Sequence, residues 1–286
     1  MKKAIHKIGG VLLTVASVTL LGGLLSATLL RFAPGYGMDE RELDPRLNAA
    51  SRQAMRDSNR IKSSLLSYYG HYLNGAVHGD LGTSQWLERP VASLVRERAP
   101  VTLRSVFLAI GVSWICGLGL AVAGVFIRRH AFDILGTAAS GLLLSVPAGV
   151  VAILAVHLRA PVFFAIAVAV FPKVYRHIRN LFDHAYEQPC VLAAKSRGIR
   201  PRGIVFRHVL PLISAPLLAL FGVSFSMAFG AAIPMEALCD SPGLGQLAWQ
   251  GALNRDLSLV VNLTLLITLA TVTVNVFANA AKERAW

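Results

Sequence analysis

The stretch VLAAKSRGIRPRGIVFRHVLP, residues 191–211, lies between long apolar runs and decides how the chain is arranged in space. It carries five Lys or Arg side chains and no acid. The chain around it has 286 residues, is 55% hydrophobic and has a mean hydropathy of +0.57, which is too apolar for a soluble domain that needs a large polar surface. The composition therefore predicts an integral membrane protein, in which so basic a stretch marks one side of the bilayer.

Small and rigid residues predict the local structure of this stretch. Ala193 and Ala194 permit close packing of a helix, and Gly198 can adopt the positive φ that ends it. Arg200-Pro201 favours the start of the next helix, because proline is well tolerated in a first turn. We therefore expect a helix-turn-helix elbow that lies along the inner membrane face, with its basic side chains near lipid headgroups.

Runs without Asp, Glu, Lys, Arg or His predict the membrane spans. About 20 apolar residues in a helix match a hydrocarbon core of roughly 30 Å. Five runs are long enough: residues 8–30, 105–127, 134–156, 209–235 and 257–281. A sixth run, 160–172, has only 13 residues, but Lys173, Arg176 and Arg179 follow at helical spacing. These side chains can extend toward the headgroups, so the helix can continue past its apolar part. The chain is thus predicted to be all-α, with six transmembrane helices.

Basic residues in short connections stay on the cytoplasmic side of a membrane. Lys2, Lys3 and Lys7 place the N-terminus inside, and six spans return the C-terminus there. The region 173–208, with eight Lys or Arg against two acids, also falls inside. The chain then divides into an N-terminal transmembrane helix at 1–30, an extracytoplasmic helical segment at 31–104 and a core domain at 105–286. The first span is read as an anchor, because its uncharged run exceeds the roughly 7–15 residues of a signal core.

The outer segment is the one large polar part of the chain. Its apolar residues recur at three- and four-residue steps, which predicts amphipathic helices. Arg52, Arg56 and Arg60 recur every four residues. They form either a solvated or headgroup-facing surface or a basic stripe that meets an acidic partner. Residues 91–95, followed by Pro100, predict a short helix that leads into the second span.

The sequence shows no pattern for chemistry of its own. It lacks GxxxxGK[ST], so we do not expect it to hydrolyse ATP. Its three cysteines fall in different compartments and form no CxxC pair, so neither a disulfide nor a metal site is predicted. Ser224 and Ser226 lie in a span without a His at the same depth, which argues against a nucleophile. We predict a transport subunit that is not an enzyme and has no cofactor.

The charge pattern of the sequence also bears on nucleic-acid binding and on ion-coupled transport. The net charge of +13 does not indicate nucleic acid, because the basic residues are distributed as topology determinants without an aromatic-basic groove pattern. Ion- or proton-coupled carriers place an acid or Arg within a span, and the five long runs contain none. Asn262 or backbone carbonyls could still bind sodium, so a secondary transporter acting without an ATPase is the alternative, and a membrane scaffold or peptide-resistance component is a third possibility.

The elbow resembles the inner loop of binding-protein-dependent ABC importers. The pattern there is Glu-Ala-Ala, three residues, Gly, nine residues, Ile, any residue and Leu-Pro. This chain keeps the spacing, with Leu in place of Glu and His in place of Ile, at Leu192, Ala193, Ala194, Gly198, His208, Leu210 and Pro211. The peptide and nickel branch of the family often relaxes the Glu position, so the departure favours that branch.

Further motifs resemble dipeptide and oligopeptide permeases in the same order along the chain. They are GDLGTS (79–84), RPV (89–91), RAPVTL (98–103), LLSVPAG (143–149), SPGLG (241–245) and RD (255–256). Two features depart from the family. The outer connection at 157–161 is shorter than is common, and segment 39–78 has no counterpart.

The resemblance implies a type I ABC importer permease fold, and a permease subunit that moves peptides or related small solutes by alternating access. It implies as partners a second permease subunit, identical or homologous, two ATP-binding subunits and an extracytoplasmic solute-binding protein. The membrane would be the bacterial inner (plasma) membrane. The residues expected to couple the ATPase are Leu192, Ala193, Ala194, Lys195, Gly198, Arg202, Leu210 and Pro211. An outer gate loop is expected at Pro242, Gly243 and Gly245, although an ordinary Pro-Gly turn explains the same residues.

Overall fold

The computed structural model describes residues 13, 17–18, 20–25, 28, 75, 80–127 and 130–284. Regular structure among these residues is helical, with one isolated β-bridge between Thr83 and Pro90. Contacts divide the chain into two compact units. One comprises Met1–Glu97 and Ala248–Thr268, and the other comprises Arg98–Leu247 and Leu269–Trp286.

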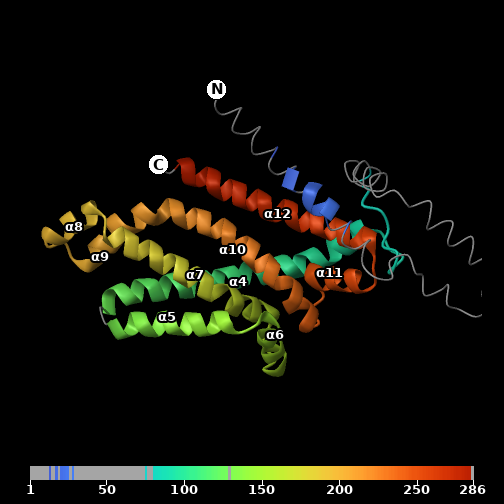
Figure 1. Ribbon diagram of the computed structural model, residues 1–286, viewed down its shortest axis with the longest axis horizontal. Helices are drawn as coiled ribbons and strands as arrows, with labels where there is room; N and C mark the ends of the chain where they lie inside the picture. Colours follow the sequence, from blue (N-terminus) through green and yellow to red (C-terminus); the bar gives the residue numbers. More distant parts are fainter. Residues whose placement is uncertain are drawn as a thin grey trace, which may run out of the picture. The chain divides into compact units, whose positions relative to one another are not determined.

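The helices from residue 91 onward follow one another with short connections (Figure 1). In chain order they are α4 (Val91–Ile127), α5 (His130–Ser145), α6 (Ala148–His157), α7 (Val162–Tyr186), α8 (Pro189–Ser196), α9 (Pro201–Ile204), the π-helical turn η2 (Val205–Val209), α10 (Leu210–Leu238), α11 (Leu244–Leu253) and α12 (Leu257–Arg284). This arrangement confirms the predicted all-α class for the described residues.

Three stretches of the described residues are long and apolar enough to cross a membrane. They are Val91–Phe126, Pro201–Leu238 and Leu257–Ala280, and they confirm the apolar runs at 105–127, 209–235 and 257–281. Large apolar side chains remain exposed on the helices, among them Phe107, Ile115, Leu142, Ile153 and Phe277. Such a surface suits lipid or a second subunit better than water.

The predicted span at 134–156 is not one continuous helix. Ile134–Ser145 and Ala148–His157 are bent by 92° at the break between them. Pro147 lies at this break with φ −59° and ψ 142°. Proline has no N–H to donate and disfavours the helical conformation of the residue before it, so the sequence Ser-Val-Pro ends α5 and starts α6.

Two other sequence-based expectations are settled by the helix bounds. The short helix at 91–95 is not separate, because α4 runs through Pro100 without a break. Helix α7 does continue past its apolar part to Tyr186, as the spacing of its basic residues predicted. Most of the predicted first span at 8–30, and the outer segment up to residue 79 with its arginine stripe, lie outside the described residues.

Helix α7 provides much of the core of the Arg98–Leu247 unit. Its buried side chains recur every four residues at Ile166, Val170, Val174, Ile178 and Phe182. Four-residue spacing places them on one face of a helix, and this face packs against α10 and α5. The charged residues of α7 fall on its other faces.

Polar side chains link the helices at several levels of this unit. The indole nitrogen of Trp114 donates to Ser224 Oγ at 3.2 Å, and Ser224 Oγ donates to the carbonyl of Leu220 at 2.7 Å. Asn275 Nδ2 donates to Ser226 Oγ at 2.6 Å. Both serines therefore serve helix packing, which is the usual role of hydroxyls in spans.

Close packing of α10 against α12 depends on Gly222. A Cβ atom at this position would lie 2.8 Å from Cβ of Ala278 and 3.1 Å from Cα of Asn275. We predict that Gly222→Ala destabilises the protein by roughly 1–3 kcal/mol, since a packed core must move apart. Unfolding of the purified protein by heat or denaturant measures the change.

Gly230, in the same helix, is the matched control. A Cβ there meets nothing within 4 Å, so Gly230→Ala should be neutral or should stabilise α10 by up to about 1 kcal/mol. Equal effects of the two substitutions would contradict the proposed helix contact.

Candidate functional site: the basic elbow and the outer loop

The 191–211 stretch folds as an elbow between α7 and α10. Helix α8 begins with Pro189 in its first turn, and α9 begins with Pro201 in its first turn. The fixed φ of proline suits the start of a helix, where its missing N–H is not needed. The prediction of two short helices with a start at Arg200-Pro201 is confirmed.

Gly198 closes α8 with a left-handed residue, as its position in the sequence predicted. Its φ is +73°. Its N–H donates to the carbonyl of Lys195 at 3.0 Å, and the N–H of Ile199 donates to the carbonyl of Ala194 at 3.3 Å. This pair of bonds is a Schellman motif, which satisfies the last carbonyls of a helix and turns the chain away from its axis.

The two alanines of the elbow do not share one role. Ala194 is buried together with Val191, whereas Leu192 and Ala193 are exposed, Leu192 by 50%. The close packing that the two alanines permit is seen within this chain for Ala194, while Ala193 lies on the exposed face, because adjacent residues of a helix point about 100° apart.

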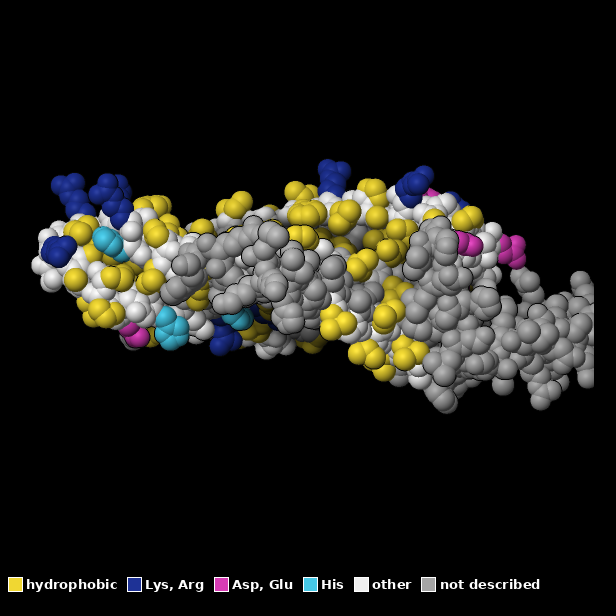
Figure 2. Space-filling model, turned by 90° about the horizontal axis from the view of Figure 1, so that it is seen from above, with side chains coloured by type: hydrophobic (Ala, Val, Ile, Leu, Met, Phe, Trp, Pro, Cys, Tyr) yellow, Lys and Arg dark blue, Asp and Glu magenta, His cyan; other side chains and the backbone are white. Residues whose placement is uncertain are grey.

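Basic and apolar side chains share the exposed surface of the elbow. Figure 2 shows Lys and Arg side chains protruding at the end of the molecule that carries α8 and α9. The exposed basic residues of this stretch include Lys195, Arg197, Arg200 and Arg202, and its large exposed apolar residues are Leu192, Ile199 and Phe206. Such a mixture is typical of a surface that contacts a protein, with apolar anchors inside a charged rim.

The inner side of the elbow is fastened to α7. The Lys195 ammonium lies 4.6 Å from the centroid of the Tyr186 ring, a favourable cation–π distance. Arg179 and Asp183 form an ion pair at 3.2 Å one turn earlier. These side chains line a cavity of about 370 Å³ between α4, α7, α8 and α9.

Leu210 and Pro211 begin α10 directly after the π-helical turn. Pro211 cannot donate a hydrogen bond to the carbonyl four residues earlier. The preceding residues widen into η2, and the Leu210 N–H donates to the carbonyl of Val205, five residues back. The Leu-Pro pair thus marks the junction of the elbow with the helix that crosses the membrane.

Of the predicted outer gate residues, Pro242 and Gly243 lie in the loop between α10 and α11, and Gly245 lies in the first turn of α11. The N–H of Leu244 donates to Thr102 Oγ1 at 2.7 Å, and the N–H of Gly245 donates to Glu236 Oε2 at 2.8 Å. A Cβ at Gly243 would lie 2.5 Å from Thr102 Oγ1, and one at Gly245 would lie 2.7 Å from Cα of Ile233. Close approach of the chain accounts for glycine at both positions.

Glu236 is the functional candidate that the sequence analysis missed. The apolar run ended at Met235, but α10 continues to Leu238, and Glu236 is buried with 0% of its surface exposed. Thr102 Oγ1 donates to its Oε2 at 3.0 Å. An acid therefore does lie on a long span helix, which corrects the expectation that none does. The SPGLG motif directly after Glu236 is the sequence signal that could have indicated a hydrogen-bond partner for its carboxylate.

A second polar cluster joins two of the sequence motifs, GDLGTS and RD, in the other unit. Asp256 of the RD motif accepts bonds from Ser84 Oγ at 2.5 Å, from the Trp86 N–H at 3.1 Å and from the Leu259 N–H at 3.0 Å. It is the N-cap of α12 and also holds the GDLGTS segment. Asn262 Nδ2 donates to the carbonyls of Leu81 and Ser258, so its amide is used for structure.

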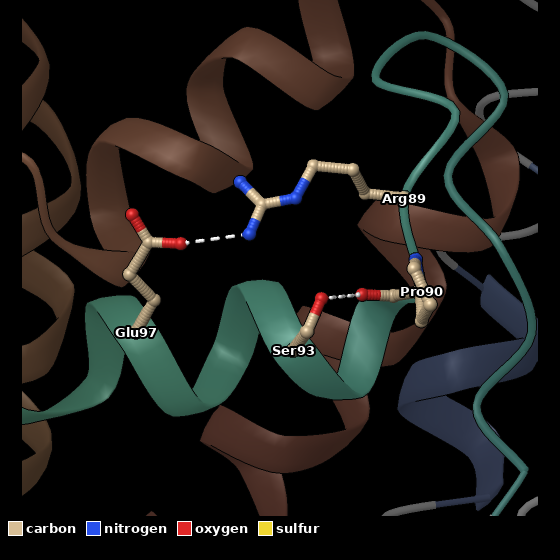
Figure 3. Close-up of polar contacts among 4 residues, drawn as sticks. All are labelled: Arg89, Pro90, Ser93 and Glu97. Atoms are coloured by element: carbon tan, nitrogen blue, oxygen red, sulfur yellow. Dashed lines mark hydrogen bonds and ion pairs between the residues drawn. The ribbon is translucent and has the colours of Figure 1, made fainter.

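The RPV motif forms local contacts at the start of α4. Figure 3 shows Arg89 Nη2 paired with Glu97 Oε2 at 3.0 Å, and Ser93 Oγ bonded to the carbonyl of Pro90 at 2.7 Å. The two charged side chains are 51% and 55% exposed. An ion pair so open to solvent contributes little to stability.

The chain is similar to known transport proteins over most of its length. The family described as "Binding-protein-dependent transport system inner membrane component" matches residues 102–284. The oligopeptide transport system permease protein OppB of Escherichia coli strain K12 is 27% identical over 267 residues, which cover 85% of each chain. OppB of Salmonella typhimurium is 27% identical with the same coverage.

We predict that Asp256→Ala loosens the segment around Ser84. The substitution removes an N-cap, at a cost of roughly 1 kcal/mol, and leaves the buried Ser84 hydroxyl without its acceptor, at a further cost of roughly 1–3 kcal/mol. Asp256→Asn keeps a capping oxygen and should lose less. The measurements are unfolding of the purified protein and the rate of limited proteolysis near residues 80–90. Similar losses for the two variants would contradict the capping role.

Proposed function

Because this chain belongs to the family of binding-protein-dependent transport system inner membrane components, it is a permease subunit of an ABC importer, and we propose that its solute is a peptide. The proposal of a peptide rests on the OppB relatives, whose name assigns them to oligopeptide transport. The order of the motifs from residue 79 to residue 256 supports the same branch.

We propose that the exposed face of the elbow is where a separate ATP-binding subunit docks. The observation that carries this proposal is the Schellman turn at Gly198, which sets α8 and α9 at an angle and leaves Leu192, Ala193 and Arg202 exposed. Ala194 is buried on the opposite side of α8, and the exposed Lys195 side chain extends over the Tyr186 ring of α7. Leu210 and Pro211 join the elbow to α10.

Alternating access is the mechanism that this arrangement favours. The stretch Pro201–Leu238 runs from α9 through η2 and α10 as one candidate span, so a displacement of the elbow is carried along a single helical rod. Closure of the ATP-binding subunits would thus tilt the spans. The loop with Pro242, Gly243 and Gly245, at the other end of α10, is the proposed outer gate.

The proposed assembly contains a second permease subunit, homologous or identical, two ATP-binding subunits and an extracytoplasmic solute-binding protein. The proposed topology has six spans with both termini in the cytoplasm. The six spans would be the first span at 8–30, the three long candidate spans, the bent α5–α6 pair and α7. An N-terminal helix at 1–30, an outer segment at 31–104 and a core domain at 105–286 remain the proposed division. The comparisons give no support to an ion-coupled carrier.

We predict that Gly198→Val uncouples ATP hydrolysis from transport. A β-branched residue at φ +73° is strained by roughly 1–2 kcal/mol, so the turn should open and displace α8. A Cβ there meets nothing within 4 Å, and the spans should therefore still insert. The assay is ATP-driven uptake of labelled tri-alanine into proteoliposomes that contain the whole importer, with ATP hydrolysis measured in parallel.

Gly198→Asn is the matched variant, because asparagine tolerates the left-handed conformation. It should retain most of the uptake that Gly198→Val loses. Unchanged uptake and unchanged ATPase stimulation in Gly198→Val would refute the docking role of the elbow. Failure of other peptides to compete with tri-alanine would refute the substrate class alone.

Orientation gives a further prediction. In a chain whose three cysteines are replaced by serine, a cysteine at position 192 should react with a membrane-impermeant maleimide only in inside-out vesicles. A cysteine at position 86 should react only in right-side-out vesicles, since Trp86 lies in the proposed outer segment and is 41% exposed. Labelling of position 192 from the exterior would overturn the proposed topology.

A further inference from the structure

Glu236 occupies the point at which three helices of one unit meet. It lies in the last turn of α10, and its bonds reach Thr102 on α4 and the first turn of α11. Helix α10 follows the elbow at its other end. One helix therefore carries the proposed ATPase contact at its start and a buried carboxyl group at its finish.

The bonds of this cluster satisfy the start of α11. The first amides of a helix have no partner within the helix and carry partial positive charge. Glu236 Oε2 accepts from the N–H of Gly245, and Thr102 Oγ1 accepts from the N–H of Leu244 while it donates to Glu236. Thr102 is 1% exposed and Glu236 is fully buried. Water cannot replace either acceptor without opening the loop.

The loop also locks onto α10 through its backbone. The N–H of Ser241 donates to the carbonyl of Glu236 at 2.9 Å. The glycines at 243 and 245 bring the chain so close to Thr102 and Ile233 that no larger residue fits. Packing of this kind has few intermediate arrangements, so the loop either keeps all of these contacts or loses all of them at once.

We propose that Glu236 is a positioning residue for the transport cycle, which transmits movement of α10 to the outer loop at 240–245 and to α4. This inference rests on the proposed function, because it takes the elbow as the point at which ATP-driven movement enters. Glu236 makes no contact with solute in this role. Glu236 determines whether the outer end of the transport pathway moves when the inner end moves.

The reactivity of Cys239, directly after α10, can be used to follow the state of this cluster. It is half-buried, and its thiol points to the carbonyl of Ala152 at 3.7 Å. Burial raises the pKa of the Cys239 thiol above its ordinary value. Because the thiolate is the reactive form, labelling should be slow at neutral pH while the loop is closed and faster when it opens. Cys116 and Cys190 are exposed and are replaced by serine for this measurement.

The experiment uses the whole importer in nanodiscs, with maleimide labelling of Cys239 measured without nucleotide and with ATP trapped by vanadate. In the otherwise unchanged protein the labelling rate should differ between the two states. Thr102→Val removes one donor and one acceptor from the cluster and should abolish this difference. It should also lower the uptake of tri-alanine per ATP hydrolysed, because movement of α10 would no longer be passed to the outer loop.

Two variants separate positioning from general stability. Thr102→Ser restores the hydroxyl and should restore both the nucleotide dependence and the uptake. Glu97→Gln removes a carboxylate from the same helix, at an exposed ion pair, and should change neither. Nucleotide-dependent labelling that persists in Thr102→Val, or a loss in Thr102→Val that Thr102→Ser does not rescue, would overturn the role of Glu236. If Gly198→Val also had no effect, the proposed function itself would fail.

Discussion

The hydrocarbon interior of a membrane offers no hydrogen-bond partner, so polar groups at the ends of helices must find partners within the protein. The two buried carboxyl clusters supply such partners to the helix ends that they join, while Glu236 Oε1 itself is buried without a hydrogen-bond partner among the described residues. Asp256 caps α12 and holds the Ser84 hydroxyl, while Glu236 and Thr102 hold the first amides of α11. Each cluster joins segments more than 100 positions apart in the sequence. The motifs that follow one another along the chain are thus parts of two structural joints.

The elbow meets the opposite condition, because its basic side chains are exposed. Its backbone is satisfied locally by the Schellman motif at Gly198, and its side chains are left exposed. The two faces of the short helix α8 therefore have different roles. Val191 and Ala194 hold it to the protein, and Leu192 and Ala193 are presented outward. Rigid attachment on one face and a free face on the other are what a docking element requires.

Local backbone chemistry was the part of the structure that could be predicted from sequence. Gly198, Arg200 and Pro201 have conformational preferences that hold in almost any context, so the turn of the elbow followed from their order. The continuation of α7 followed from the spacing of its basic residues. Glu236 could not be found in this way, because a search for uncharged runs ends at the first charge, whereas the protein buries that charge with partners distant in sequence. Proline at position 147 can kink a helix, but the size of the bend could not be predicted, since an apolar run shows length but not direction.

The two halves of α7 differ in character, with an apolar half up to Pro172 and a charged half from Lys173 to Tyr186. The charged half is about 20 Å long. Charged side chains are costly in hydrocarbon, so this half stands among headgroups and water and carries α8 at its tip. A subunit bound to α8 therefore works at a distance from the bilayer. A small tilt of α7 about its apolar half then moves the exposed face of α8 much farther than it moves the part of α7 within the membrane.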